Sequence, residues 1–207
     1  MSNMIDIIDY DMGNIASIKN MLHKIGCNDV IISREKEDIL GADKLILPGV
    51  GAFEQGVKNL KKFDLFDAIK EAVERRRIPI LGICLGMQLL GRKSEEGNPI
   101  DGLSLIPFDT IRFRLNSEYK IPHMGWNDVK IAKCNVLVQG LDEGIQRFYF
   151  VHSYHAKCDD ESDILMTCNY GYDFTAAVSK GNVYGVQFHP EKSHMYGMNL
   201  LKNYVEM

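Results

Sequence analysis

The sequence has no surplus of positive charge and no long hydrophobic run. Its 24 Lys and Arg residues are outnumbered by 28 Asp and Glu residues, and no basic stripe indicates a nucleic-acid-binding surface. The apolar runs fall far short of the roughly 20 residues that a membrane span needs. The first six residues lack the basic start and long apolar stretch of a secretory signal. We therefore expect a globular protein that binds neither nucleic acid nor a membrane.

Cysteine pairs are missing as well. The five cysteines are odd in number and widely spaced, and none belongs to a Cys-x-x-Cys motif. This usage is typical of reduced thiols in a cytoplasmic protein. His152, His155 and Cys158 follow one another at intervals of three, but such intervals alternate between the two faces of a strand, which disfavours a zinc site. We therefore expect no metal, no cofactor and a cytoplasmic location.

The first 90 residues alternate between short apolar runs and helical stripes. The expected strands are 5–8, 30–32, 44–47 and 78–82. Helices are expected between them, and one of these should begin at a cap on Asp64. Because strands and helices alternate, this half predicts a doubly wound sheet of mostly parallel strands.

After Gly91 the pattern is mostly β. Residues 147–155 are expected to form one strand, and Lys180-Gly181-Asn182 a hairpin turn before a last helix at 193–205. No linker or repeat divides the chain. The sequence predicts one domain over residues 1–207, an α/β fold with a doubly wound, mostly parallel central sheet and added antiparallel β elements.

The stretch from Ile78 to Leu90 contains the pattern Gly82-Ile83-Cys84-Leu85-Gly86 between a strand and a helix. This is the pattern of a nucleophile elbow with cysteine as the nucleophile. The two glycines relieve the crowding of so sharp a turn, and the start of the following helix favours the thiolate. A buried structural cysteine between helix-packing glycines would give a similar pattern, so Cys84 needs a base and an orienting group.

His189 is the best candidate for the base among the six histidines. It closes the expected strand 183–188 and is followed by Pro190 and Glu191. Residues i and i+2 of an extended chain project to the same side, so Glu191 can bond one ring nitrogen and fix the tautomer. The other nitrogen is then free to take a proton from sulfur. The alternative is a strand-end histidine followed by a turn and a solvated glutamate.

An oxyanion needs preorganised N–H donors. In elbow hydrolases one donor is the amide after the nucleophile, here Leu85, and the second comes from a loop after a neighbouring strand. The loop Pro48-Gly49-Val50-Gly51 is well placed for the second donor. It is not a phosphate-binding P-loop, because no Gly-Lys-Ser/Thr follows. An ordinary glycine turn is the alternative.

Together these motifs resemble the class I (triad) glutamine amidotransferases, and most closely the glutaminase subunits of imidazole glycerol phosphate synthase, the HisH family. The matching stretches occur in the family's order along essentially the whole chain. They are Leu47–Phe53, Gly82–Leu90, Gly102–Ile106, Pro122–Asn127, Tyr149–Tyr154 and Gly185–Ser193. The resemblance implies a flavodoxin-like class I glutamine amidotransferase fold.

The resemblance also implies the roles of the site residues. Cys84 would attack the side-chain amide of glutamine, His189 would transfer protons, and Glu191 would orient His189. Leu85 and a flipped amide near Val50 and Gly51 would stabilise the oxyanion. The residues that would hold the amino-acid end of glutamine are Gln88, Glu96, Ser153 and Tyr154, of which Glu96 is assigned by its spacing from Cys84.

In this family the ammonia passes to a (β/α)8 cyclase subunit in a heterodimer, which forms imidazole glycerol phosphate. A chain of 207 residues accommodates a glutaminase without a synthase domain. An apolar surface beside the site would suit such a partner, although core packing would explain the same residues. The residues that would face the partner are Met12, Pro122, Met124, Trp126, Tyr149 and Lys192.

Other functions stay open. Asp11-Met12 and the stretch after Ser193 depart from the usual family pattern and are similar to paralogues that supply ammonia for surface-polysaccharide sugar amidation. A free-standing cysteine hydrolase or peptidase is a second alternative, and Gln88 with Ser153 and Tyr154 argues against it. A catalytically silent regulatory subunit is a third, which the presence of Cys84, His189 and Glu191 disfavours.

Overall fold

The computed structural model describes residues 4–141 and 145–207. Residues 1–3, which open the segment that lacks a signal pattern, lie outside the described residues. One half of the central sheet is parallel, so the carboxyl ends of its strands share one edge. In spatial order its strands are β2 (Val30–Ser33), β1 (Ile5–Ile8), β3 (Lys44–Leu47), β4 (Ile80–Ile83) and β12 (Val183–Val186).

The other half of the sheet continues from β12 in antiparallel strands. These are β11 (Tyr172–Lys180), β10 (Ile164–Tyr170), β7 (His123–Ile131) and β8 (Gln146–His152). A branch made by β9 (Tyr154–Cys158) pairs with β11 and with β6 (Phe108–Arg112), which also pairs with β5 (Lys93–Ser94). The predicted α/β fold with a mostly parallel sheet and added antiparallel strands is confirmed.

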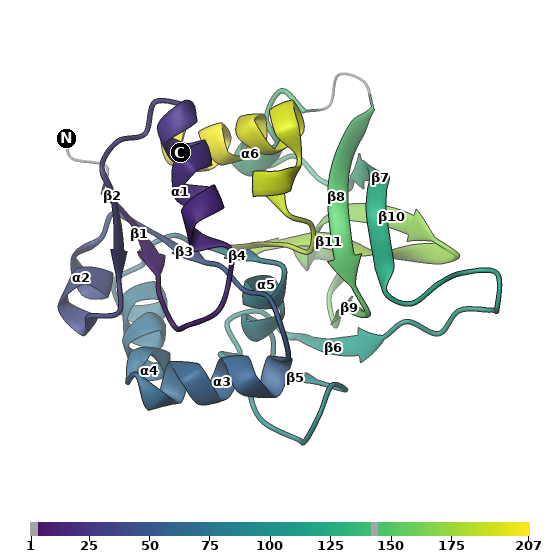
Figure 1. The fold of residues 1–207 in the computed structure, drawn as a ribbon, viewed down its shortest axis with the longest axis horizontal. Helices are drawn as coiled ribbons and strands as arrows, with labels where there is room; N and C mark the ends of the chain where they lie inside the picture. The colour runs from purple at the N-terminus through teal and green to yellow at the C-terminus, as the bar shows by residue number, and fades with distance from the viewer. Residues whose placement is uncertain (1–3, 142–144) are drawn as a thin grey trace.

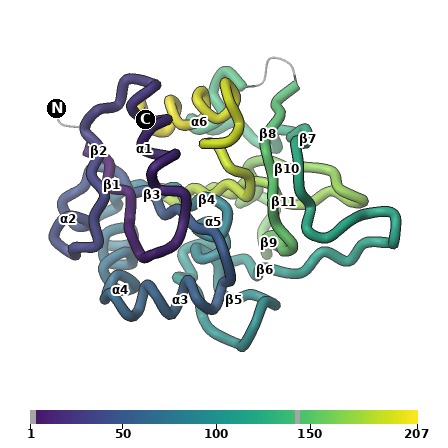
Figure 2. The backbone as a smooth tube through the Cα atoms, in the orientation of Figure 1, coloured from purple at the N-terminus to yellow at the C-terminus, as the bar shows by residue number. Residues whose placement is uncertain are grey.

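Helices cover both faces of the parallel half, because side chains alternate along each strand. In β3, Leu45 and Leu47 enter one core and Ile46 enters the other. The first core lies under α2 (Lys36–Gly41), α3 (Phe53–Lys62), α4 (Leu65–Lys70) and α5 (Leu85–Leu89). The second lies under α1 (Ile15–Lys24) and α6 (His194–Glu206) (Figure 1). These last two helices lie side by side (Figure 2). No helix within residues 4–141 and 145–207 has the length and apolar character that a membrane crossing requires.

Three local features differ from the sequence-based expectations. Helix α3 was not expected, although Phe53, Val57 and Leu60 bury one of its faces in the core. Asp64 occupies the N-cap position of α4 as predicted, but it is left-handed (φ 57°) and its side chain makes no capping bond. The single strand expected at 147–155 is broken at Ser153, because β8 pairs with β7 whereas β9 pairs with β6. The hairpin turn at Gly181 and Asn182 is confirmed by the pairing of the residues on either side.

Candidate active site

The turn between β4 and α5 has the geometry of a nucleophile elbow. Cys84 has φ 54° and ψ −108°, a backbone conformation that non-glycine residues seldom adopt. A Cβ added to Gly82 would lie 2.7 Å from the carbonyl of Gly86, and one added to Gly86 would collide with the Leu47 carbonyl oxygen. Both glycines are therefore required for the turn to close against the sheet. Cys84 is 7% exposed at the carboxyl edge of the parallel strands.

His189 reaches this edge because β12 runs parallel to β4. The Cys84 N–H donates to the Val186 carbonyl at 2.8 Å, and His189 follows three residues later. Glu191 Oε1 lies 2.9 Å from His189 Nδ1, and both side chains are 1% exposed. A tight helical turn at Pro190–Lys192, rather than the extended chain that was expected, brings the carboxylate to the ring.

The charge state of His189 follows from these neighbours. Burial opposes protonation of the ring, but the Cys84 sulfur and the Glu191 carboxylate outweigh it and raise the pKa of His189 to about 9. Among the described residues, the buried Nε2 has no hydrogen-bond partner. Because the carboxylate accepts a hydrogen bond from Nδ1, Nε2 is the nitrogen left for proton transfer.

Ser193 explains how the base is held against β8. Its hydroxyl donates to the His189 carbonyl at 2.6 Å and accepts the Tyr149 N–H at 3.0 Å. The His189 N–H in turn donates to the Tyr149 carbonyl at 2.9 Å. The backbone of the base is therefore clamped to a strand of the antiparallel half.

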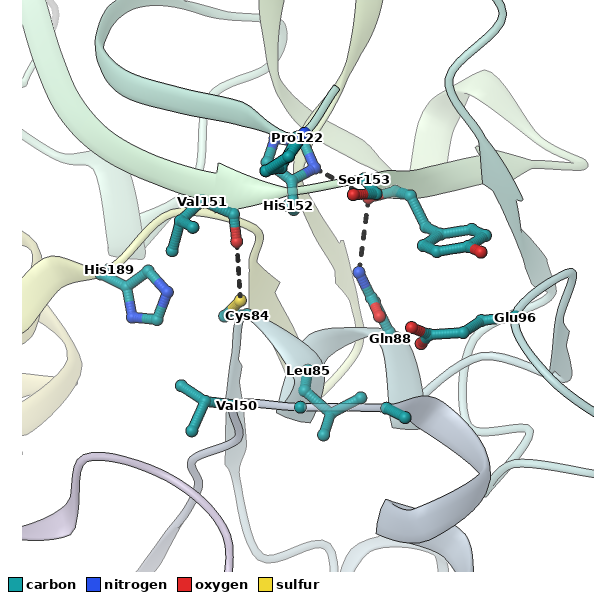
Figure 3. A pocket seen from close by; sticks show the side chains of 13 residues that line it. Val50, Cys84, Leu85, Gln88, Glu96, Pro122, Val151, His152, Ser153 and His189 are labelled. Carbon is teal, nitrogen blue, oxygen red and sulfur yellow. Dashed lines mark hydrogen bonds between the residues drawn. The ribbon is translucent and has the colours of Figure 1, made fainter. Parts of the chain in front are cut away.

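A cavity of about 450 Å³ opens beside Cys84 and His189 (Figure 3). Every predicted oxyanion and substrate-binding residue lines it, whereas Glu191 stands behind His189. These residues are Val50, Gly51, Leu85, Gln88, Glu96, Ser153 and Tyr154. Glu96 also accepts the Phe53 N–H at 2.9 Å and so caps α3. Figure 3 shows its carboxylate turned toward Gln88.

The Leu85 N–H, the first predicted oxyanion donor, is not free in this structure. The Leu85 N–H donates to the Gly49 carbonyl at 3.3 Å, so a carbonyl oxygen occupies the position that an oxyanion would take. Gly51 has φ +111°, which favours glycine, and Val50 between the two glycines is 43% exposed. The loop thus presents a carbonyl oxygen to the elbow, whereas oxyanion binding requires an N–H donor there.

Four of the six predicted partner-facing residues form a patch on β7, β8 and the segment after β12. On the outward side of β7, Met124 is 62% and Trp126 is 42% exposed. The Trp126 ring is stacked on His194 at 5.3 Å and meets Tyr149 edge-on at 6.2 Å. Lys192 Nζ lies 5.7 Å from the centre of the Tyr149 ring. These side chains lie outside the cavity.

Of the other two predicted partner-facing residues, one lines the cavity and the other packs on the glycine-rich loop. Pro122 lines the cavity. Met12 packs on the glycine-rich loop, with its Cε 2.9 Å from where a Cβ on Gly51 would stand. The predicted surface therefore reaches from the patch to the oxyanion loop.

The sequence analysis missed a set of buried polar side chains around the cavity. His152 lines it and donates from Nδ1 to the Tyr154 carbonyl at 2.7 Å, while its Nε2 lies 3.0 Å from His123 Nδ1. Gln187 lies between Gln88 and Cys84. Gln187 and His189 are two residues apart, and this alternation was the signal that could have identified Gln187. Within the described residues, no three His, Cys, Asp or Glu side chains are arranged to hold a metal ion.

Known proteins resemble this chain over its full length. The family model for glutamine amidotransferase class-I matches residues 6–207. Imidazole glycerol phosphate synthase subunit HisH 2 of Methanococcus maripaludis is 54% identical over 203 residues, which cover 98% of this chain and 99% of that protein. The subunit HisH 2 of Pseudomonas aeruginosa is 51% identical over 204 residues, covering 99% and 100%. A crystal structure of a glutamine amidotransferase has the same fold, with a TM-score of 0.75, 20% identity and 98% coverage of both chains.

Proposed function

This chain belongs to the class-I glutamine amidotransferase family, among the HisH subunits of imidazole glycerol phosphate synthase, and we propose that Cys84, His189 and Glu191 form its catalytic triad. It is the glutaminase subunit of that enzyme and acts in histidine biosynthesis. The observation that supports the triad most directly is the buried pair of His189 and Glu191, 2.9 Å apart, beside a strained Cys84.

The triad hydrolyses glutamine in two steps. The Cys84 thiolate attacks the side-chain amide carbon, and the protonated His189 gives its Nε2 proton to the departing nitrogen, which leaves as ammonia. A water molecule then loses a proton to the neutral His189 and attacks the γ-glutamyl thioester, which releases glutamate and the thiolate. Since the pKa of His189 is about 9, the ring is protonated at neutral pH, as the first step requires.

The oxyanion of each step binds to the Leu85 N–H and to a second amide from the glycine-rich loop. Because the Gly49 carbonyl now accepts the Leu85 N–H, the peptide between Gly49 and Val50 has to turn over first. Gln88, Glu96, Ser153 and Tyr154 bind the amino-acid end of glutamine. A carboxylate and uncharged polar groups in one cavity suit the ammonium and carboxylate of that end.

The partner is a (β/α)8 cyclase, and Met12, Pro122, Met124, Trp126, Tyr149 and Lys192 contact it. Exposed Met and Trp side chains with a cation at their edge are typical of an interface. Hydrolysis is slow in the isolated chain and is stimulated when the cyclase carries its ligand. Residues 1–207 act as one domain in the cytoplasm, which is consistent with five unbridged cysteines.

Replacement of the nucleophile tests the triad. Cys84→Ala should abolish glutamine-dependent synthesis in the complex with the cyclase, while synthesis from added ammonium salt continues and the partner still binds. Cys27→Ala is a matched control, because Cys27 is 8% exposed and lies outside the cavity. Glutamine hydrolysis that survives in Cys84→Ala would show that the triad assignment is wrong.

The destination of the ammonia has its own test. Expression of the chain with its cyclase should restore growth of a histidine auxotroph that lacks both subunits. Failure of this complementation, with glutaminase activity intact, would instead favour surface-sugar amidation.

A further inference from the structure

Gln187 is fully buried beside the nucleophile and has no part in the triad chemistry described above. It lies between β12 and His189, and its side chain points to the same side as the His189 ring. Phe188 points the other way and stacks on Phe148 with ring centres 3.9 Å apart. The extended segment therefore directs two polar side chains, Gln187 and His189, at Cys84.

A carbonyl group determines how the amides near Cys84 are oriented. The Tyr154 carbonyl can only accept, and it receives His152 Nδ1 at 2.7 Å and Gln88 Nε2 at 3.4 Å. The second N–H of Gln88 donates to Gln187 Oε1 at 3.1 Å. Gln187 must then direct its own Nε2 elsewhere, and this nitrogen lies 3.7 Å from Cys84 Sγ.

This orientation has a consequence at each end of the chain of hydrogen bonds. At one end, the Cys84 sulfur lies between the Val151 carbonyl, 4.0 Å away, to which only the thiol can donate, and the Gln187 N–H. A hydrogen bond from this N–H to a thiolate is stronger than one to a neutral thiol. At the other end, both N–H groups of Gln88 are used. Gln88 therefore offers the cavity its oxygen, an acceptor that suits the ammonium group of a glutamine substrate.

We propose that Gln187 is a positioning residue of the glutaminase site, which holds the Cys84 thiolate with its N–H and fixes the amide orientation of Gln88 with its oxygen. This inference rests on the proposed triad. A glutamine that merely fills the core would contribute to stability, but it would affect neither the ionisation of Cys84 nor the binding of glutamine.

The ionisation of Cys84 is followed by its rate of alkylation across a pH series, in which the neighbouring titratable groups have to be accounted for. Besides Tyr154 and Glu96, which line the cavity, three titratable side chains line it or act on the sulfur: His189, His152 and Tyr10. Burial lowers the pKa of His152 to about 3 and raises the pKa of Tyr10 far above its ordinary value, so both stay uncharged. The pKa of His189 is about 9, so the ring is protonated at neutral pH and loses its proton only at the alkaline end of the series. Glu96 also lines the cavity. A comparison with Glu96→Gln measures what the Glu96 charge adds to the pH dependence of Cys84 alkylation.

The test is Gln187→Met, which keeps the length of the side chain and removes both hydrogen bonds. In the complex with the cyclase, the pH midpoint for alkylation of Cys84 by iodoacetamide should rise by about one unit, and the KM for glutamine should rise about tenfold. Gln146→Met is the matched control, because Gln146 is also buried (8% exposed) and lies at the far end of β8, roughly 20 Å along the strand from the cavity. Equal alkylation profiles and KM values for the two variants would overturn the proposal.

A measurement on the unmutated chain covers the case in which Gln187→Met does not fold. The side-chain N–H signals of Gln187 in a ¹⁵N NMR spectrum should shift as Cys84 ionises, and this shift should be absent in Cys84→Ala. Signals that do not respond to pH in the wild-type chain would refute the contact. Loss of hydrolysis in Cys84→Ala together with an unchanged Gln187→Met would reject the role of Gln187 alone, whereas hydrolysis by Cys84→Ala would reject the triad.

Discussion

Glu191→Gln is expected to lower the pKa of His189 by more than one unit. The pKa of His189 is about 9 against an ordinary value of 6.5, a difference that corresponds to about 3 kcal/mol in favour of the imidazolium. Burial acts in the opposite direction, so Cys84 and Glu191 together contribute more than this net amount. If they contribute equally, removing the carboxylate charge lowers the pKa to below about 8.

The change also affects the tautomer. A carboxylate can only accept the hydrogen bond from His189 Nδ1, but the introduced amide can turn and donate to this nitrogen. In that orientation the proton moves to Nε2, and the ring can no longer take a proton from Cys84 or from water. We therefore expect kcat for glutamine hydrolysis in the complex to fall by about 10²–10⁴-fold, the usual contribution of general acid–base catalysis.

Two assays separate the effect of losing the Glu191 charge from the effect of changing the His189 tautomer. The His189 ring protons, followed by NMR between pH 5 and 11, should titrate near 9 in the wild-type chain and below about 8 in Glu191→Gln. The alkaline limb of the hydrolysis profile should move to lower pH by the same amount, since activity requires the protonated ring. Glu95→Gln is a suitable control, because Glu95 lies beside the cavity-lining Glu96 but outside the cavity, where it bonds Arg112 and Arg114. A titration midpoint that stays near 9, with kcat within threefold of wild type, would refute the assigned role of Glu191.

Further predictions concern the fold and the cavity. Gly86→Ala should lower the free energy of unfolding in urea by at least about 1–3 kcal/mol, because the added Cβ clashes with the Leu47 carbonyl. The control Gly41→Ala, whose added Cβ has no atom near it, should change this free energy by less than about 1 kcal/mol. Burial, and then the charge of Asp38, raise the pKa of Asp6 from 3.8 to about 7, so the stability that Asp6 contributes is complete below pH 3.8 and is lost as the pH rises through 7. Wild type should therefore lose roughly 3 kcal/mol between pH 5 and 8 from this group, and Asp6→Asn, measured by urea unfolding at both values, should not. Glu96→Gln should raise the KM for glutamine about tenfold with little change in kcat, since it removes the charge facing the substrate ammonium but retains an acceptor for the α3 cap.

The core of the site was predictable because its signals are local. Glycines at 82 and 86 are required by contacts within one turn and its neighbouring strand end. His189 and Glu191 are two residues apart, so their contact needed no knowledge of the sheet. The parallel strands were predicted from the alternation of short apolar runs with helical stripes. In such a sheet the carboxyl ends of the strands lie at one edge, so the loops after these strands were expected to meet there.

The features that were missed depend on distant parts of the chain. The strand at 147–155 is broken because β8 and β9 choose different neighbours, and a period-2 pattern contains no information about pairing. The link from Tyr154 through Gln88 and Gln187 to Cys84 joins three separate segments, since Cys84 and Gln88 share the elbow and its helix. Each side chain alone is an ordinary polar residue, and only the folded chain shows that Gln88 donates to both Tyr154 and Gln187, which leaves the Gln187 N–H directed at Cys84.

From the resting oxyanion loop we infer how the proposed partner would control the proposed triad without touching it. While the Gly49 carbonyl accepts the Leu85 N–H, a developing oxyanion would face another negative oxygen, and the loss of one oxyanion donor costs about 10²–10³ in kcat. The loop is held on one side by the Tyr10 hydroxyl, which donates to the Pro48 carbonyl at 2.5 Å. On the other side it is held by Met12, which packs against Gly51. The first contact is buried, whereas the second belongs to the proposed partner surface. A cyclase that moves Met12 would release the Gly51 side while Tyr10 keeps Pro48 in place. The peptide between Gly49 and Val50 would then have to break only the bond from the Leu85 N–H in order to turn over.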